Sequence, residues 1–142
     1  MDNFIERYRI KTSICNNLID YFNNNLEYKT QGQFGNGVVN KDIKESIDCF
    51  FYNQSTNKHI IEFFETLSIH VQDYVNKYNI DYPLQTSFQN VIQYYPSNGG
   101  YKKIHYEEKC SLIIWPADFT QPHKGVVTDV EKYICTGWLE MI

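Results

Sequence analysis

Apolar side chains recur at three- and four-residue steps in two stretches of the N-terminal half, a spacing typical of one face of a helix. The first stretch begins after Thr12 or Ser13, either of which can cap a helix, and ends in a run of asparagines at 23–25. The second follows Ser55 and Thr56 and continues to about Lys77. The apolar members are Ile14, Leu18, Ile19 and Phe22 in the first stretch and Ile60, Phe63, Phe64, Leu67, Val71, Tyr74, Val75 and Tyr78 in the second. The pattern predicts two helices that support a sheet.

Short apolar and aromatic runs bounded by turn residues predict strands in the rest of the chain. The predicted strands cover residues 49–52, 88–95, 101–107, 112–115 and 132–138, with a turn at 96–100. Glycines at positions 32, 35 and 37 interrupt the stretch 26–42, which we expect to be a loop or an irregular strand. We find no repeat and no linker. The prediction is one α+β domain over residues 1–142, with helical support at about 12–80 and a β core at about 88–138.

Length and charge narrow the classes of function. A chain of 142 residues is one domain that can bury a core. Its net charge of −4 argues against nucleic acid or acidic membranes as partners, so we expect a small molecule or a peptide. The sequence has no apolar run near the roughly 18 residues of a membrane helix and no basic, then apolar leader, which predicts a cytoplasmic protein with no membrane partner. The four cysteines show no C-x-x-C spacing and are expected to be reduced thiols.

Two candidate metal ligands lie two residues apart in the predicted strand 101–107. His105 and Glu107 point to the same face of a strand, because strand side chains alternate with period two. His123, the histidine downstream of them, would complete a set of two histidines and one carboxylate. Such a set suits Fe(II) oxygenases, because it leaves cis positions open for a co-substrate and O2. A zinc site that adds Cys110 to these three residues is an alternative, although closed zinc sites favour cysteine-rich sets.

Lys132 lies nine residues after His123 and opens a strand-like run. One face of this run carries Lys132, Ile134, Thr136 and Trp138, and the other carries Tyr133 and Cys135. The permanent positive charge of Lys132 suits the distal carboxylate of a dicarboxylate co-substrate. The alternative is a solvated lysine at the end of a strand.

These residues resemble the Fe(II)- and 2-oxoglutarate-dependent dioxygenases, in the branch that looks like prolyl 4-hydroxylases. The resemblance covers most of the chain, from about Ile14 to Trp138. Four segments carry it: the tyrosine-plus-glycine turn at 93–101, the hydrophobic segment 113–119, the closing segment 132–138, and the segment 44–48 (Lys-Glu-Ser-Ile-Asp). Ten residues separate Tyr95 from His105, as the family pattern expects.

The resemblance implies a double-stranded β-helix, which is the jelly-roll or cupin-like fold, with supporting N-terminal helices. It implies that His105, Glu107 and His123 hold Fe(II), and that Tyr95, Tyr101 and Lys132 contact the co-substrate 2-oxoglutarate. The implied activity is hydroxylation with O2 of a prolyl residue in a peptide, with ascorbate as a further cofactor. Tyr95 and Tyr101 also fit aromatic strand residues that pack on the long helix.

One departure from the family is large. In the family several strands separate the ligand strand from the segment of the second histidine, and they would occupy roughly 35–50 residues. Here seven residues, 108–114, lie between Glu107 and Trp115. We therefore expect a truncated core in which strands 101–107 and 112–115 form a hairpin and exposed strand edges favour a homo-oligomer. The alternative function is that of a catalytically inactive dioxygenase-fold remnant that acts as a binding or assembly module.

Overall fold

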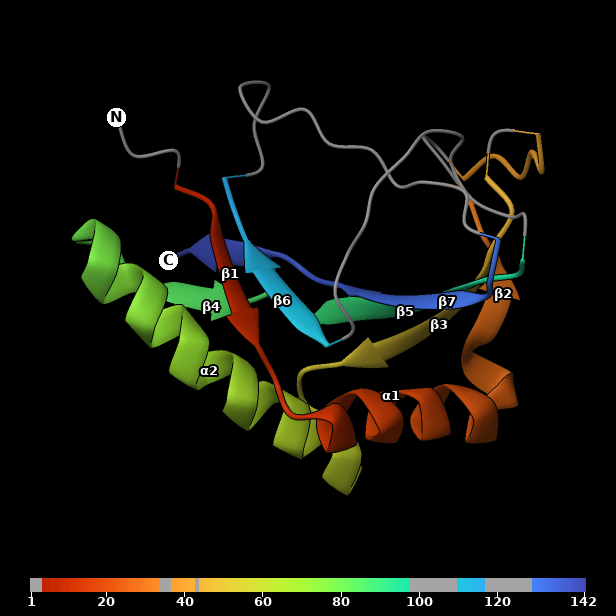
Figure 1. Cartoon of the computed structure of the whole chain (residues 1–142), viewed down its shortest axis with the longest axis horizontal. Coiled ribbons are helices and arrows are strands. Elements are labelled where there is room, and N and C mark those ends of the chain that lie inside the picture. The colour runs from red at the N-terminus through yellow and green to blue at the C-terminus, as the bar shows by residue number, and fades with distance from the viewer. Residues whose placement is uncertain (1–3, 34–36, 43, 98–109, 117–128) are drawn as a thin grey trace.

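The computed structural model describes residues 4–33, 37–42, 44–97, 110–116 and 129–142 (Figure 1). Its elements are, in chain order, β1 (Glu6–Arg9), α1 (Thr12–Asn24), the short 3-10 helix η1 (Leu26–Tyr28), β2 (Lys29–Gln31), β3 (Ile47–Tyr52), α2 (Lys58–Tyr78), β4 (Leu84–Thr86), β5 (Gln89–Tyr95), β6 (Ser111–Ile114), β7 (Lys132–Thr136) and β8 (Leu139–Met141). Both predicted helices are confirmed. The predicted strand 101–107, and with it the predicted hairpin, lies outside the described residues.

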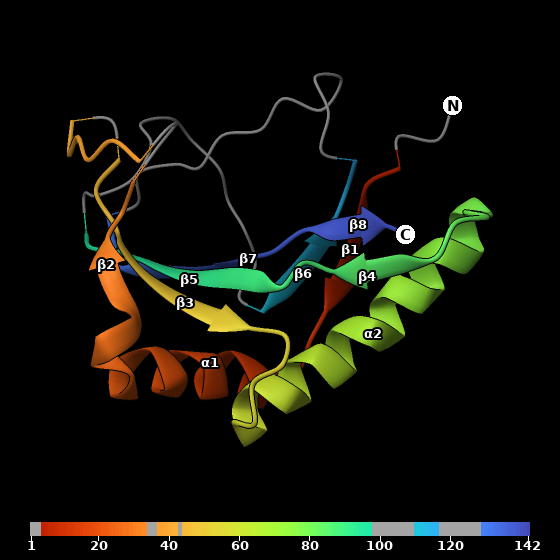
Figure 2. The same ribbon diagram turned by 180° about the vertical axis from the view of Figure 1, so that it is seen from behind.

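An antiparallel four-stranded sheet forms the centre of the described chain, in the order β2-β3-β5-β7. Strand β3 pairs with β5 along its whole length, from Ile47 opposite Tyr94 to Tyr52 opposite Gln89. Within the described ranges, two smaller antiparallel pairs complete the sheet structure, β1 with β6 and β4 with β8. Figure 2 shows that β4 and β8 continue past the ends of β5 and β7. The predicted α+β class is therefore confirmed, and the strand pairs of the described residues are antiparallel.

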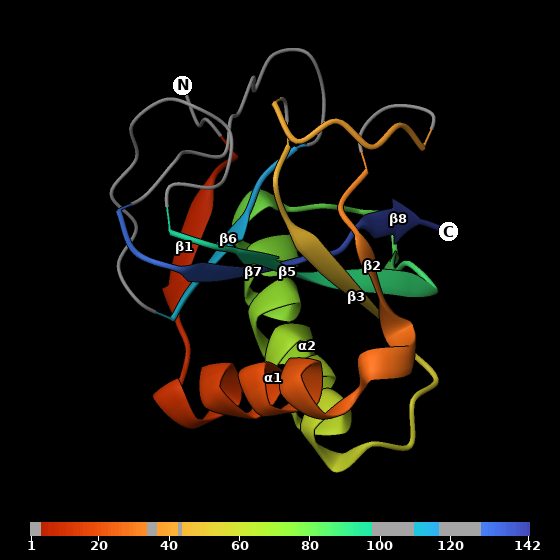
Figure 3. The same ribbon diagram turned by 90° about the vertical axis from the view of Figure 1, so that its right-hand side faces the viewer.

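Both helices cover the same face of the four-stranded sheet (Figures 1 and 3). Phe51 of β3 and Ile92 of β5 lie in this layer and are 0% and 1% exposed. The ring of Phe51 contacts both helices, since its centroid is 6.3 Å from that of Tyr21 and 5.9 Å from that of Phe63. Burial of each large apolar side chain contributes about 1.5–3 kcal/mol. This layer attaches the helices to the sheet, as the periodicity of α2 predicts.

The start of α1 differs from the prediction. Thr12 and Ser13 lie in the first turn of the helix, and the N-cap is Lys11, which makes no side-chain cap bond. The expectation that Thr12 or Ser13 caps the helix is wrong. The backbone N–H of Ile10 donates to the carbonyl of Cys110 at 3.0 Å, which fixes the chain directly before Lys11. We infer that this tertiary contact sets the helix start ahead of the residues with the better capping chemistry.

The predicted strand 132–138 is divided in the structure. β7 ends at Thr136, and β8 begins at Leu139 and pairs with β4 instead of β5. Gly137 lies at the break, where an added Cβ would be 1.9 Å from Oδ1 of Asn90. Asn90 is buried, and its amide donates to the carbonyl of Ser87 at 3.1 Å. The close approach of Asn90 thus requires glycine at the point where the chain leaves the main sheet.

Gly32 lets the end of β2 approach the segment that enters β3. Its N–H donates to the carbonyl of Ser46 at 2.8 Å, and an added Cβ would lie 2.0 Å from Oγ of Ser46. We expect Gly32→Ala to lower the free energy of unfolding by about 1–3 kcal/mol, the usual cost of overpacking. Urea denaturation would measure this loss. The same substitution should cost less in a Ser46→Ala background, and an equal cost in both backgrounds would rule out the clash with the Ser46 hydroxyl.

Candidate functional site

The structure describes some of the residues predicted to form the site and not others. Tyr95 and Lys132 are described, whereas Tyr101, His105, Glu107 and His123 lie outside the described residues. The part of the site whose geometry can be described is therefore the sheet that carries Tyr95 and Lys132.

The face of the sheet that points away from the helices carries three rows of cross-strand neighbours. In order along β5, the rows are Phe50, Val91 and Thr136; then Asp48, Gln93 and Ile134; then Tyr95 and Lys132. The side chains between these rows point to the helices, because strand residues alternate. The rings of Tyr94 and Tyr133 lie 6.0 and 5.4 Å from that of Phe22 in α1. Tyr95 therefore faces away from the helices. The alternative expectation, that Tyr95 packs on the long helix α2, is wrong.

Tyr95 and Lys132 lie directly opposite each other on β5 and β7. The Lys132 ammonium is 5.4 Å from the centroid of the Tyr95 ring, within the range of a cation–π contact. Tyr95 is 4% exposed and Lys132 is half-buried, so the charge is partly shielded from water. The Tyr95 hydroxyl lies 3.5 Å from Oε1 of Gln93, which is long for an O–H···O bond. A cation and a phenolic hydroxyl placed side by side can bind a carboxylate.

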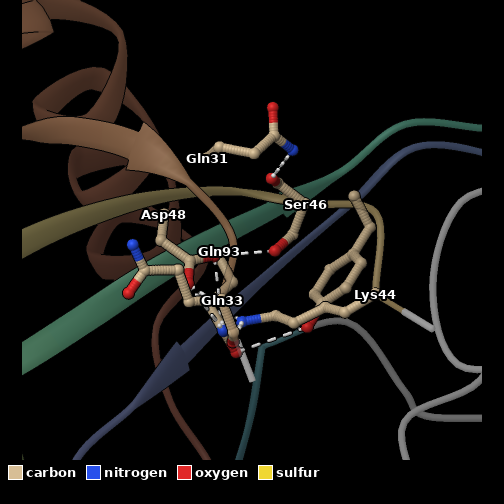
Figure 4. Close-up of polar contacts among 7 residues, drawn as sticks. Gln31, Gln33, Lys44, Ser46, Asp48 and Gln93 are labelled. Atoms are coloured by element: carbon tan, nitrogen blue, oxygen red, sulfur yellow. Dashed lines mark hydrogen bonds and ion pairs between the residues drawn. The ribbon is translucent and has the colours of Figure 1, made fainter. Parts of the chain in front are cut away.

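A buried polar network continues from Gln93 across the sheet (Figure 4). The carboxylate of Asp48 is its centre and accepts from Nζ of Lys44 at 2.9 Å and from the hydroxyl of Ser46 at 2.8 Å. The side-chain amide of Gln93 lies 3.4 Å from both carboxylate oxygens. The Lys44 and Asp48 side chains are 6% and 8% exposed. An isolated buried charge costs several kcal/mol, so each of these two charges can be buried only because the other neutralises it.

The same network joins Lys44 and Ser46, which precede β3, to residues at the end of β2. Lys44 also donates to the carbonyl of Gln33 at 3.2 Å, and the Gln31 amide donates to the carbonyl of Ser46 at 2.9 Å. The segment 44–48 is one of the four that carry the family resemblance. Through Asp48 it contacts Gln93, whose side chain lies beside that of Tyr95. In the sequence, the period-two spacing of residues 93 and 95 indicates that they share a face. No sequence signal marks Gln31, which donates through its side-chain amide, or Gln33, which accepts through its backbone carbonyl.

All four cysteines lie within the described residues, and each is free. Burial, together with a hydrogen bond to Cys110, raises the pKa of the Cys15 thiol to about 12. Burial also raises the pKa of Cys49. Both groups are therefore protonated, unreactive thiols at neutral pH. The alternative zinc site, which uses Cys110, has its three other ligands outside the described residues.

Within the described ranges, no group of three or more His, Cys, Asp or Glu side chains is arranged to hold a metal ion. No helix in that part of the chain has both the length and the apolar character needed to cross a membrane. Comparison with protein-family models, curated proteins and solved structures finds no match. A functional assignment therefore rests on the residues and their arrangement.

Proposed function

We propose that the chain is an Fe(II)- and 2-oxoglutarate-dependent hydroxylase on a shortened double-stranded β-helix, with a prolyl residue of a peptide as substrate. The observation that carries the proposal is the pair Tyr95 and Lys132, opposite each other on one face of the sheet. In this proposal the four-stranded sheet is a retained part of the β-helix. Its helix-covered face is the outside, and the co-substrate lies on the other face.

Lys132 supplies the positive charge for the distal carboxylate of 2-oxoglutarate. The Tyr95 hydroxyl donates to the same carboxylate, by turning from its long contact with Gln93. Partial burial of the pair strengthens both interactions, because the local dielectric is lower than in water. The resemblance supplies the remaining roles: Tyr101 as a further co-substrate residue, and His105, Glu107 and His123 as ligands of Fe(II).

When bound, Fe(II) and 2-oxoglutarate use O2 so that one oxygen atom enters succinate as CO2 leaves, and the other enters a C–H bond as a hydroxyl group. The part of this chain is to bind and orient. Lys132 and Tyr95 fix one end of the co-substrate relative to the sheet, which limits the positions open to the other end. The carboxylate of Asp48 holds the side chain of Gln93 in place, and Gln93 in turn limits the positions open to the Tyr95 hydroxyl.

A second candidate is the inactive remnant that acts as a binding or assembly module, and the sizes of the sheets favour it. Among the described residues the strands form one four-stranded sheet and two pairs. A jelly-roll fold has about eight strands in two facing sheets. The two candidates differ in their need for a metal, because a hydroxylase requires the iron site and a remnant does not.

Calorimetric titration with Mn(II), a surrogate for Fe(II), separates the two candidates. The purified chain should bind Mn(II), and His105→Ala and Glu107→Ala should each abolish that binding, because each removes one ligand of the facial set. His59→Ala is the matched control, since His59 is a half-buried histidine of α2 outside the proposed site. This variant should bind Mn(II) like the wild type. Equal binding by the wild type and both ligand variants would overturn the metal site and the hydroxylase proposal with it.

A further inference from the structure

A hollow lies on the same face of the sheet as Tyr95 and Lys132, toward the other end of β5. Its floor is the row Phe50, Val91 and Thr136, and its rim includes Phe88, Trp138 and Glu140. The volume is about 400 Å³, within the range of roughly 300–1,000 Å³ that small-ligand sites occupy. Val91 and Tyr95 are four residues apart on one strand, so the hollow is about 13 Å from the proposed co-substrate site.

Two large aromatic rings on the rim are exposed to water although the fold fixes their backbone. Phe88 is 57% exposed and Trp138 is 55% exposed. The Phe88 ring packs beside that of Tyr52, with centroids 5.0 Å apart. Trp138 is held through its backbone, because its carbonyl accepts from the N–H of Ser87 at 2.9 Å. Exposed aromatic faces at fixed positions attract cations through the negative charge above the ring.

Glu140 makes the lining of the hollow negatively charged. It is the one formally charged side chain among the described residues that line the hollow. Trp138 and Glu140 are two residues apart and both border the same space, and Glu140 is anchored by the pairing of β8 with β4, opposite Gln85. Aromatic faces beside a carboxylate complement an ammonium or guanidinium group, whereas an anion would be repelled. The net charge of −4 favours a cation as well.

We propose that this hollow, the aromatic–acidic pocket formed by Phe88, Trp138 and Glu140 over Phe50, binds the basic side chain of a lysine or arginine in a peptide. As a substrate subsite, the pocket rests on the proposed function and narrows the substrate to peptides that carry a positive charge. Binding of the basic side chain itself needs neither Fe(II) nor 2-oxoglutarate. The two proposals can therefore fail separately.

Fluorescence of Trp138 reports on the aromatic–acidic pocket directly. The chain has two tryptophans, so Trp115→Phe leaves Trp138 as the reporter. A blocked Gly-Lys-Gly peptide should change this fluorescence saturably. The same peptide with norleucine in place of lysine should bind at least about fivefold more weakly, since a contact of about 1 kcal/mol corresponds to that factor. Calorimetry on the wild type repeats the comparison without any tryptophan substitution.

Substitutions of single carboxylates test whether the lysine peptide binds in the aromatic–acidic pocket. Glu140→Gln should weaken binding of the lysine peptide about fivefold and leave the norleucine peptide unaffected. Glu65→Gln, which alters an exposed carboxylate on α2, should change neither. Lysine binding that persists in His105→Ala, together with loss of Mn(II) binding, would show that the pocket acts independently of the metal. Equal affinity for the two peptides, or unchanged lysine binding in Glu140→Gln, would overturn the proposal.

Discussion

Lys132→Met is expected to weaken the binding of 2-oxoglutarate about ten- to a hundredfold. A charge-assisted bond to a carboxylate in a partly desolvated place contributes about 1.5–3 kcal/mol, and each 1.4 kcal/mol or so is a factor of ten in affinity. Methionine keeps an unbranched apolar stem beside the ring of Tyr95, so the loss reports mainly the charge. Calorimetric titration of 2-oxoglutarate into the Mn(II)-loaded chain measures it. The affinity for Mn(II) should change little, because Lys132 is not a proposed ligand.

Lys29→Met is the matched control for this substitution. The Lys29 ammonium also lies over an aromatic ring, 4.1 Å from the centroid of Phe22, but on the side of the sheet that faces the helices. Both substitutions remove a cation–π contact, and only Lys132→Met removes the proposed carboxylate site. If both variants bind 2-oxoglutarate as the wild type does, Lys132 is a strand-end lysine with no role in co-substrate binding.

Asp48→Ala is expected to lower the free energy of unfolding by about 3–5 kcal/mol, the usual cost of breaking a buried ion pair from one side. The substitution leaves the Lys44 ammonium buried without its carboxylate, and the Ser46 hydroxyl and the Gln93 amide lose the same acceptor. A domain has a total stability of only about 5–15 kcal/mol, so the effect should be visible as a large shift in the urea midpoint.

Two further variants show whether the loss comes from the buried charge. Replacing both partners, as in Lys44→Met with Asp48→Leu, should cost less than Asp48→Ala alone, because no unpaired charge remains. Lys77→Met breaks the ion pair with Glu6, in which the lysine side chain is 53% exposed, and should shift the urea midpoint far less than Asp48→Ala does, because water screens an exposed pair. A double variant less stable than Asp48→Ala would show that the hydrogen bonds of the network, and not the charge balance, dominate.

The sequence predicts those parts of the fold that local periodicity encodes. The stripe of α2 is continuous over many turns, and its buried members Ile60, Phe63 and Tyr74 belong to the expected set. The alternation of residues 132–136 also places Lys132 and Tyr133 on opposite faces, as observed. The shared face of Tyr95 and Lys132 follows from the alternation once their strands pair.

The features of the fold that the sequence pattern does not predict are set by contacts between residues far apart in the sequence. Strand β1 pairs with β6 across more than a hundred residues, and nothing in the four residues of either strand specifies that partner. The break at Gly137 depends on the side chain of Asn90, which is distant in sequence. The aromatic–acidic pocket likewise joins Phe88 and Glu140 only because β4 and β8 pair beside it. Periodicity reports which way a side chain points and carries no information about its distant neighbours.

Linked binding of Mn(II) and 2-oxoglutarate tests most directly whether the face with Tyr95 and Lys132 is a co-substrate site. In the proposed site the co-substrate contacts the metal at one end and Lys132 at the other, so each ligand should strengthen the binding of the other by the same factor. We expect the wild type to bind 2-oxoglutarate about tenfold or more tightly with Mn(II) present. A folded chain that binds no 2-oxoglutarate, with or without Mn(II), would contradict the proposed function.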